Sequence, residues 1–66
     1  MKSQKEKILS YIRTYGGISN RDAAMELDIY RLSARIFDLR QDGINIVTDT
    51  IRRNGKSFAV YREARE

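Results

Sequence analysis

The sequence predicts an α+β fold in which three short helices are followed by a β-hairpin. Apolar residues recur at helical spacing in three segments before residue 43, and β-forming residues concentrate between residues 44 and 61. The four glycines fall at the boundaries between these segments. At 66 residues, the chain is expected to form one domain over residues 1–66, with a stability of only a few kcal/mol.

The first predicted helix spans about residues 3–15. Ser3 is a candidate N-cap, and Glu6 stands where a capping box requires an acidic or amide side chain. The residues expected on its apolar face are Ile8, Tyr11, Ile12 and Tyr15. Gly16 and Gly17 are expected to end this helix.

The second predicted helix spans about residues 20–27, after a short connection at Ile18 that is compatible with a brief strand. Ser19 and Asp22 have the spacing of a capping box, which is worth roughly 1 kcal/mol. The residues expected to face inward are Ala23, Ala24 and Leu27.

The third predicted helix spans about residues 30–42 and follows a tight turn at Asp28-Ile29. Asp28 is expected to adopt the left-handed conformation in this turn, which costs aspartate some energy. The buried stripe is expected to consist of Leu32, Ile36 and Leu39, at positions i, i+4 and i+7. Gly43 is expected to follow the helix in a left-handed conformation.

A β-hairpin is predicted over about residues 46–61, because Asn54-Gly55 favours a type I′ turn. This turn pairs Arg53 with Lys56, and the register is left open between Ile46 and Thr50. The face expected to pack on the helices carries Val47, Ile51, Phe58 and Val60, with Asp49 as an unfavourable charge. Residues 62–66 are expected to form a frayed polar tail.

The composition argues against several kinds of site. The chain has neither cysteine nor histidine, which excludes zinc fingers, disulfides and nucleophile–histidine pairs. We therefore expect no enzyme activity, no cofactor and no metal. Gly55-Lys56-Ser57 is similar to the end of a phosphate-binding loop, but Thr50 stands where that motif needs glycine. No apolar run approaches ~20 residues and no leader precedes the first helix, so we expect no membrane interaction.

Residues 18–43 have the layout of a helix-turn-helix, whose second helix enters the DNA major groove. This segment, ISNRDAAMELDIYRLSARIFDLRQDG, resembles the small helix-turn-helix domain family of phages and bacteria. The resemblance covers about residues 5–61. It implies a winged helix-turn-helix, in which the C-terminal hairpin is the wing and the partner is double-stranded DNA. It also implies a cytoplasmic protein of a bacterial cell or a phage-infected host. Two residues depart from the family pattern: Asp28 stands where the turn often has glycine, and Tyr30 stands where the third helix often has Ser or Thr as its N-cap.

With residues 30–42 as the recognition helix, its N-terminal half is expected to contact base edges. Arg31 is the first candidate for reading guanine. The other candidates on this helix are Tyr30, Ser33, Ala34 and Arg35. Arg31, Arg35 and Asp38 also have the spacing of a surface ion-pair ladder, in which Asp38 orients Arg35.

Basic residues outside the recognition helix are candidates for phosphate contacts. The net charge is +4, and nine of the thirteen basic residues are arginine. Arg52, Arg53 and Lys56 flank the hairpin turn, where they are expected to contact phosphates or the minor groove. The alternative is a solvated edge that resists aggregation. The remaining candidates are Arg21 on the second helix and Lys2, Lys5 and Lys7 near the N-terminus.

These observations predict a sequence-specific, non-catalytic DNA-binding protein, either a transcriptional regulator or an excisionase-like accessory factor that bends DNA. The alternative is a protein-interaction module built on the same fold. Phe37, predicted on the exposed side, either packs under the hairpin, contacts thymine or contacts another protomer. We expect a monomer in solution that self-associates cooperatively on DNA.

Overall fold

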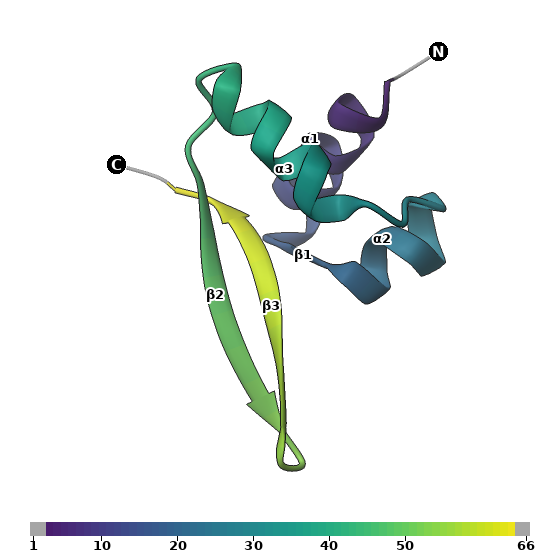
Figure 1. Ribbon diagram of the computed structural model, residues 1–66, viewed down its shortest axis with the longest axis vertical. Helices are drawn as coiled ribbons and strands as arrows, with labels where there is room; N and C mark the ends of the chain where they lie inside the picture. Colours follow the sequence, from purple (N-terminus) through teal and green to yellow (C-terminus); the bar gives the residue numbers. More distant parts are fainter. Residues whose placement is uncertain (1–2, 65–66) are drawn as a thin grey trace.

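The computed structural model describes residues 3–64 and confirms the α+β fold. Its elements are α1 (Gln4–Tyr15), β1 (Ile18–Ser19), α2 (Asn20–Leu27), α3 (Leu32–Gln41), β2 (Ile46–Arg53) and β3 (Lys56–Glu63). The three helices pack together, and the hairpin of β2 and β3 extends well beyond them (Figure 1). Within residues 3–64, no helix is long and apolar enough to cross a membrane.

Polar caps begin α1 and α2 as the sequence predicts. The Ser3 hydroxyl accepts a hydrogen bond from the backbone N–H of Glu6 at 3.2 Å. Ser19 and Asp22 form the complete capping box, with both hydrogen bonds at 3.1 Å. Asp28 ends α2 in the left-handed conformation, with φ of 57°. The predicted turn between the second and third helices is therefore confirmed.

The third helix begins later than predicted, at Leu32, and ends at Gln41. Arg31 is its N-cap residue and makes no side-chain capping bond. Neither Tyr30 nor Arg31 carries the short side-chain oxygen that accepts from the first turn of a helix. Both residues are therefore left outside α3, and the helix begins at the first buried residue. Gly43 follows with φ of 91°, as expected.

The core lies between the three helices and the base of the sheet. Its buried residues are Ile8, Ile12, Ile18, Ala23, Ile29, Leu32, Ile36, Leu39 and Ile46. Tyr15 was expected in this core, but its side chain is 71% exposed and contacts the Tyr11 ring. The reason is that α1 buries no residue after Ile12, so its last turn lies beyond the packed region.

The sheet is antiparallel, with strand order β1-β3-β2. The hairpin register predicted from Asn54-Gly55 is confirmed and continues without interruption to the pair Ile46 and Glu63. Both turn residues have positive φ, of 52° and 76°, as a type I′ turn requires.

The prediction of a frayed tail is wrong for residues 62 and 63, which belong to β3. Arg13 of α1 holds the end of this strand by donating two hydrogen bonds to the Glu63 carboxylate, at 2.9 and 3.1 Å. The backbone N–H of Ala64 then donates to the carbonyl of Asn45 at 2.8 Å. Residues 65 and 66 lie outside the described residues.

The hairpin packs on the helices through the opposite face from the predicted one. Its core face carries Ile46, Thr48, Thr50, Ala59, Tyr61 and Glu63, and its cleft face carries Val47, Asp49, Ile51, Arg53, Lys56, Phe58, Val60 and Arg62. On the cleft face, Val47 and Phe58 are 40% and 42% exposed, and only Val60, beside Gly17, is buried, at 9%. On the core face, Ile46 is 3% exposed. The reason is that β1 joins the sheet with Ile18 opposite Tyr61, which places the core on that side.

Gly17 allows β1 to approach β3 closely. A Cβ atom at this position would lie 2.7 Å from Val60 Cγ1 and 3.2 Å from Arg62 Cγ. We expect Gly17→Ala to lower the free energy of unfolding by about 1–3 kcal/mol, because the added methyl group overpacks the site. Urea denaturation followed by circular dichroism measures the change. An unchanged denaturation midpoint would contradict this account, and Thr14→Ala, at an exposed position of α1, is the control.

Candidate nucleic-acid interface

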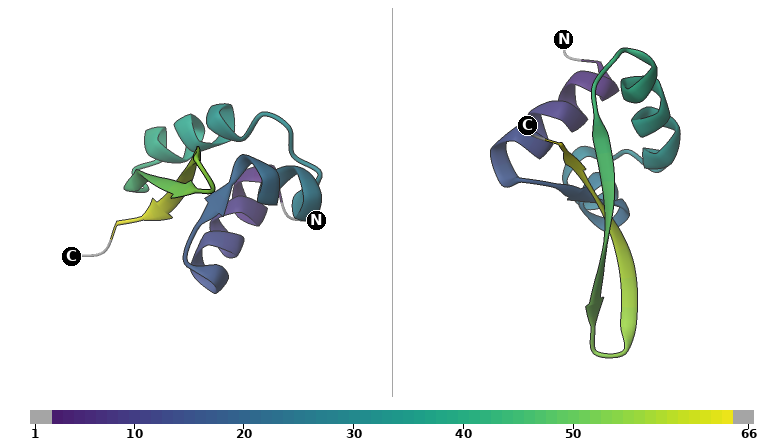
Figure 2. Two further views of the ribbon diagram at one scale, coloured as in Figure 1. Left: turned by 90° about the horizontal axis from the view of Figure 1, so that it is seen from below. Right: turned by 90° about the vertical axis from the view of Figure 1, so that its left-hand side faces the viewer.

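Helix α3 lies at the outside of the helical part. Its buried residues Leu32, Ile36 and Leu39 face the core. On the opposite side Ser33, Phe37 and Gln41 are exposed and Ala34 is half-buried. In both views of Figure 2, α3 lies at the edge of the molecule, and no other element of the described chain covers its outward-facing side. One side of this helix is therefore open to a partner.

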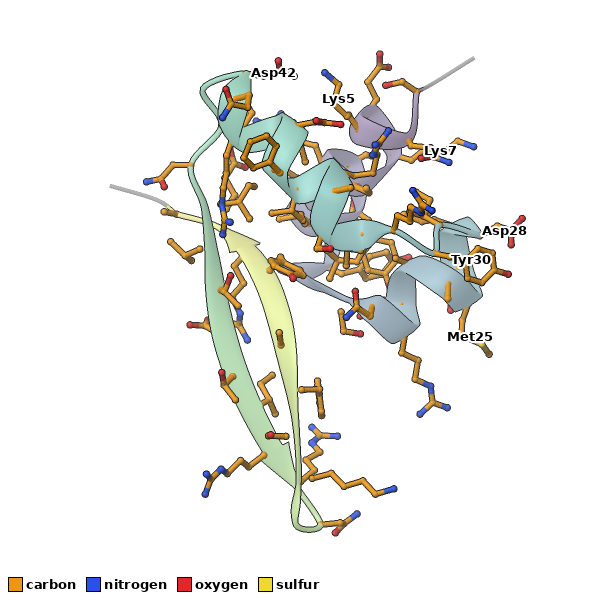
Figure 3. The ribbon with its side chains drawn as sticks, in the orientation of Figure 1. Lys5, Lys7, Met25, Asp28, Tyr30 and Asp42 are labelled. Carbon is orange, nitrogen blue, oxygen red and sulfur yellow. The ribbon has the colours of Figure 1, made fainter. Side chains whose placement is uncertain are left out.

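The turn before α3 carries two of the predicted contact residues. Arg31, the N-cap residue of α3, is exposed. Tyr30 is 78% exposed, and its hydroxyl donates a hydrogen bond to Asp28 Oδ1 at 2.7 Å. Tyr30 and Asp28 lie at one end of the helical part, where Figure 3 labels them. This hydrogen bond and the charge of the carboxylate raise the pKa of Tyr30 above its ordinary value. The hydroxyl proton is therefore directed at Asp28, whereas the Arg31 guanidinium has no partner among residues 3–64.

Arg35 lies along one flank of α3. Its Nη2 atom lies 3.4 Å from Asp38 Oδ2, and its Nε atom is buried without a hydrogen-bond partner among residues 3–64. Nearby, Lys5 of α1 donates to Asp42 at 2.6 Å (both labelled in Figure 3), and this hydrogen bond raises the pKa of Lys5. Arg35, Asp38 and Asp42 stand at i, i+3 and i+7 and so share one flank of the helix, which the Lys5–Asp42 contact shows to be the flank towards α1. The side chain of Arg35 therefore leaves the helix away from the open side.

Arg40 connects the other flank of α3 to the hairpin. Its Nε donates to the Ile46 carbonyl at 3.0 Å, and its Nη2 donates to Thr48 Oγ1 at 3.2 Å. These contacts hold the base of β2 against α3. This role of Arg40 was not predicted, although its place beside the buried Leu39 and six residues before the start of β2 was a usable signal. Both arginines within α3 are therefore engaged on its flanks.

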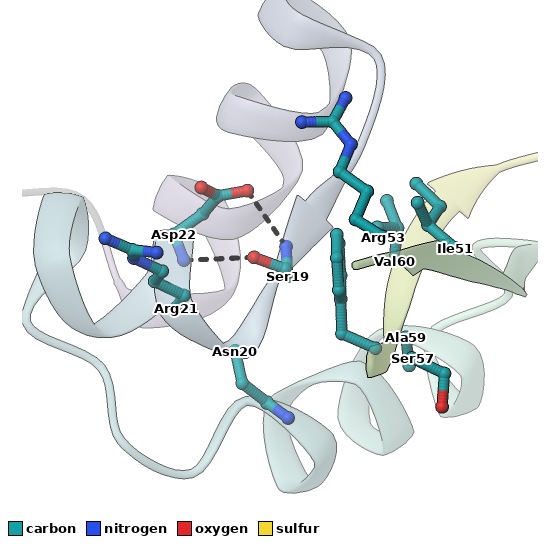
Figure 4. Close-up of a pocket in the computed structure, with 10 residues that line it drawn as sticks. Ser19, Asn20, Arg21, Asp22, Ile51, Arg53, Ser57, Ala59 and Val60 are labelled. Carbon is teal, nitrogen blue, oxygen red and sulfur yellow. Dashed lines mark hydrogen bonds between the residues drawn. The ribbon is translucent and has the colours of Figure 1, made fainter. Parts of the chain in front are cut away.

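A cleft of about 730 Å³ separates the start of α2 from the cleft face of the hairpin. Arg21 of α2 and Arg53 of β2 both line it, from opposite sides (Figure 4). Ile51 and Phe58 contribute its apolar surface. The structure thus brings together two predicted phosphate contacts that are 32 residues apart. Sequence reasoning missed the cleft itself, because it placed Ile51 and Phe58 against the core.

The basic residues that flank the hairpin turn are all exposed. Arg52, Arg53 and Lys56 are exposed at the end of the hairpin that lies farthest from the helices (Figure 1). Within the described part of the chain, none of these three cations forms an ion pair. Farther along the hairpin, Arg62 is paired with Asp49 at 3.0 Å. Lys5 is engaged by Asp42, Lys7 is exposed, and Lys2 lies outside the described residues.

Comparison with protein families identifies a match. A family model described as a winged helix-turn-helix domain matches residues 3–63, which include all six helices and strands. This match confirms the resemblance inferred from the sequence. Comparisons with curated proteins and with solved structures gave no match.

Proposed function

Since the chain belongs to the winged helix-turn-helix domain family, whose members typically bind DNA, we propose that it is a non-catalytic, sequence-specific double-stranded DNA-binding protein. Helix α3 enters the major groove, and the hairpin contacts the adjacent backbone or the minor groove. One observation carries this proposal. Among residues 3–64, the cations that form no ion pair include Arg31 at the start of α3 and Arg21 and Arg53 on the two sides of the cleft.

The proposed contacts divide into two groups. Arg31, at the start of the recognition helix, reads the base edges, with Ser33 and Ala34 beside it. Tyr30 and Arg35 join this group only if DNA displaces the carboxylates that hold them, which are Asp28 for Tyr30 and Asp38 for Arg35. The phosphate contacts are Arg21, Arg52, Arg53 and Lys56.

The cleft between α2 and the hairpin supports this division. Arg21 and Arg53 come from its opposite sides, and the Asp22 carboxylate in its lining accepts from the Ser19 backbone N–H within the capping box. A sugar–phosphate strand that enters the cleft meets cations on both sides and the apolar surface of Ile51 and Phe58 between them. The proposed binding unit is the single domain of residues 1–66.

In a cell, the proposed protein acts in the cytoplasm as a transcriptional regulator or as an excisionase-like accessory factor. A regulator binds one operator that overlaps a promoter. An accessory factor binds several adjacent sites cooperatively and bends the DNA. DNase I footprinting with a gel-based bending assay separates the two roles. A protein-interaction module is the second candidate function, favoured by Phe37, which is 59% exposed.

The proposal predicts a steep dependence of DNA binding on salt. Four phosphate contacts give a slope of about −3.6 for the logarithm of the association constant against the logarithm of salt concentration. Affinity for a duplex selected from a random library should therefore fall roughly 100-fold between 50 and 200 mM salt. Fluorescence anisotropy measures this change. Failure to select any duplex, or affinity that does not change with salt, would favour the interaction module.

A further inference from the structure

The open side of α3 carries a short uncharged strip. Ala34, Phe37 and Gln41 stand at i, i+3 and i+7, so their side chains leave the helix within about 60° of one another. Phe37 is 59% exposed, so it does not pack beneath the hairpin. Gln41 is exposed and Ala34 is half-buried.

The charged residues of α3 lie beside this strip and not on it. Arg35 is paired with Asp38 on the flank towards α1, and Arg40 is bonded to Ile46 and Thr48 on the flank towards the hairpin. The available cations lie beyond the strip, at the start of α3 and on the hairpin. The strip is therefore uncharged, with the exposed Arg31 before its first residue and the Arg35–Asp38 and Lys5–Asp42 ion pairs along the flank towards α1. An uncharged strip suits the floor of the DNA major groove, which presents base edges, whereas the phosphates lie along the sides of the groove.

We propose that this strip reads A·T base pairs, with Phe37 packing on thymine methyl groups and Gln41 pairing with adenine. The inference rests on the proposed DNA-binding function and names the sequence that this site prefers. Thymine alone presents a methyl group in the major groove, and phenylalanine and alanine contact it through apolar surface. Adenine presents an acceptor at N7 and a donor at N6, which match the donor and acceptor of the glutamine amide.

The length of the strip sets the length of the preferred sequence. Ala34 and Gln41 are seven positions apart, which is about 10.5 Å along the helix. Base pairs are spaced about 3.4 Å apart along the duplex, so the strip covers about three base-pair steps when α3 lies along the groove. Arg31, one turn before Ala34, then reaches the guanine expected at one end of this A·T segment.

The test removes single methyl groups from the DNA. A duplex is selected from a random library with the wild-type protein, and each thymine is then replaced by deoxyuridine, one position at a time. Deoxyuridine pairs as thymine does and lacks only the methyl group. For the wild-type protein, one or two replacements should weaken binding about fourfold each, the value of one buried methyl group. For Phe37→Ala, the same replacements should change nothing, because the partner of the methyl group is already absent.

Met25→Ala is the matched control, because Met25 is an apolar residue of α2 that is 73% exposed (labelled in Figure 3). This variant should keep the wild-type deoxyuridine profile. The inference is overturned if Phe37→Ala also keeps that profile, or if no deoxyuridine weakens wild-type binding. It is also overturned if Phe37→Ala loses only the cooperativity of binding, which would assign Phe37 to a contact between two copies. These results leave DNA binding in place, whereas failure to select any duplex removes the proposed function as well.

Discussion

Replacing Ile36 by alanine is expected to lower the free energy of unfolding by about 2–5 kcal/mol. Ile36 lies in the middle of α3, is 1% exposed and belongs to the core cluster. A 66-residue domain has a total stability of about 3–10 kcal/mol, so this loss is a large part of the whole. The thermal midpoint should fall by at least about 10 °C. Circular dichroism melting and urea denaturation measure both quantities.

Ile51→Ala is the matched control, because it makes the same chemical change at a half-buried position of the hairpin. Its cost should be near 1 kcal/mol, which covers partial burial and the lower strand preference of alanine. Equal losses for the two variants would contradict the placement of the core on the side of α3. They would instead support the face that carries Ile51, which the sequence alone favoured.

The features that the sequence predicted correctly are decided within a few neighbouring residues. The Ser19–Asp22 capping box, the left-handed Asp28 and the Asn54-Gly55 turn each follow from local backbone chemistry. The type I′ turn also fixes the hairpin register, because pairing outward from two central residues leaves no freedom. The buried stripe of α3 likewise follows from the spacing of apolar residues within one segment of the sequence.

The face of the hairpin that packs on the helices is not determined by residues that are neighbours in the sequence. Counting apolar residues favoured the face with Val47 and Phe58, but the two residues of β1 decide the outcome by placing Ile18 opposite Tyr61. A two-residue strand has no periodic pattern, so its pairing with β3 could not be predicted. The misplaced charge of Asp49 was the one signal available. It is accommodated because that face is open to solvent and Arg62 pairs with it at 3.0 Å.

The candidate site divides in the same way. Helical angles correctly placed Arg31, Ser33 and Phe37 on accessible positions. They could not show that Arg35 lies against Asp38 beside α1, or that Arg40 is bonded to β2, because these contacts depend on the neighbouring elements. The ion pair of Arg35 and the hydrogen bonds of Arg40 therefore alter the predicted set of DNA-contact residues more than the later start of α3 does.

The triple substitution of Arg52, Arg53 and Lys56 by alanine should weaken DNA binding about 500-fold at 0.1 M salt. Each phosphate contact contributes about 0.9 to the salt slope, so three contacts contribute about 2.7. Counterion release no longer contributes to binding at 1 M salt. At 0.1 M, a tenfold lower concentration, a slope difference of 2.7 therefore equals 2.7 powers of ten in the association constant. Arg53→Ala alone should lower the slope by about one and weaken all sequences about equally.

The fold should survive this substitution, because all three side chains are exposed and the Asn54-Gly55 turn is unchanged. Lys7→Ala is the single-charge control for Arg53→Ala, because Lys7 lies on α1, far from the hairpin turn (Figure 3). It removes the same net charge, so an equal loss of affinity would show that only total charge matters. A triple variant that keeps the wild-type salt slope would instead assign these residues to a solvated edge. A loss confined to one DNA sequence would show that the hairpin reads bases in the minor groove.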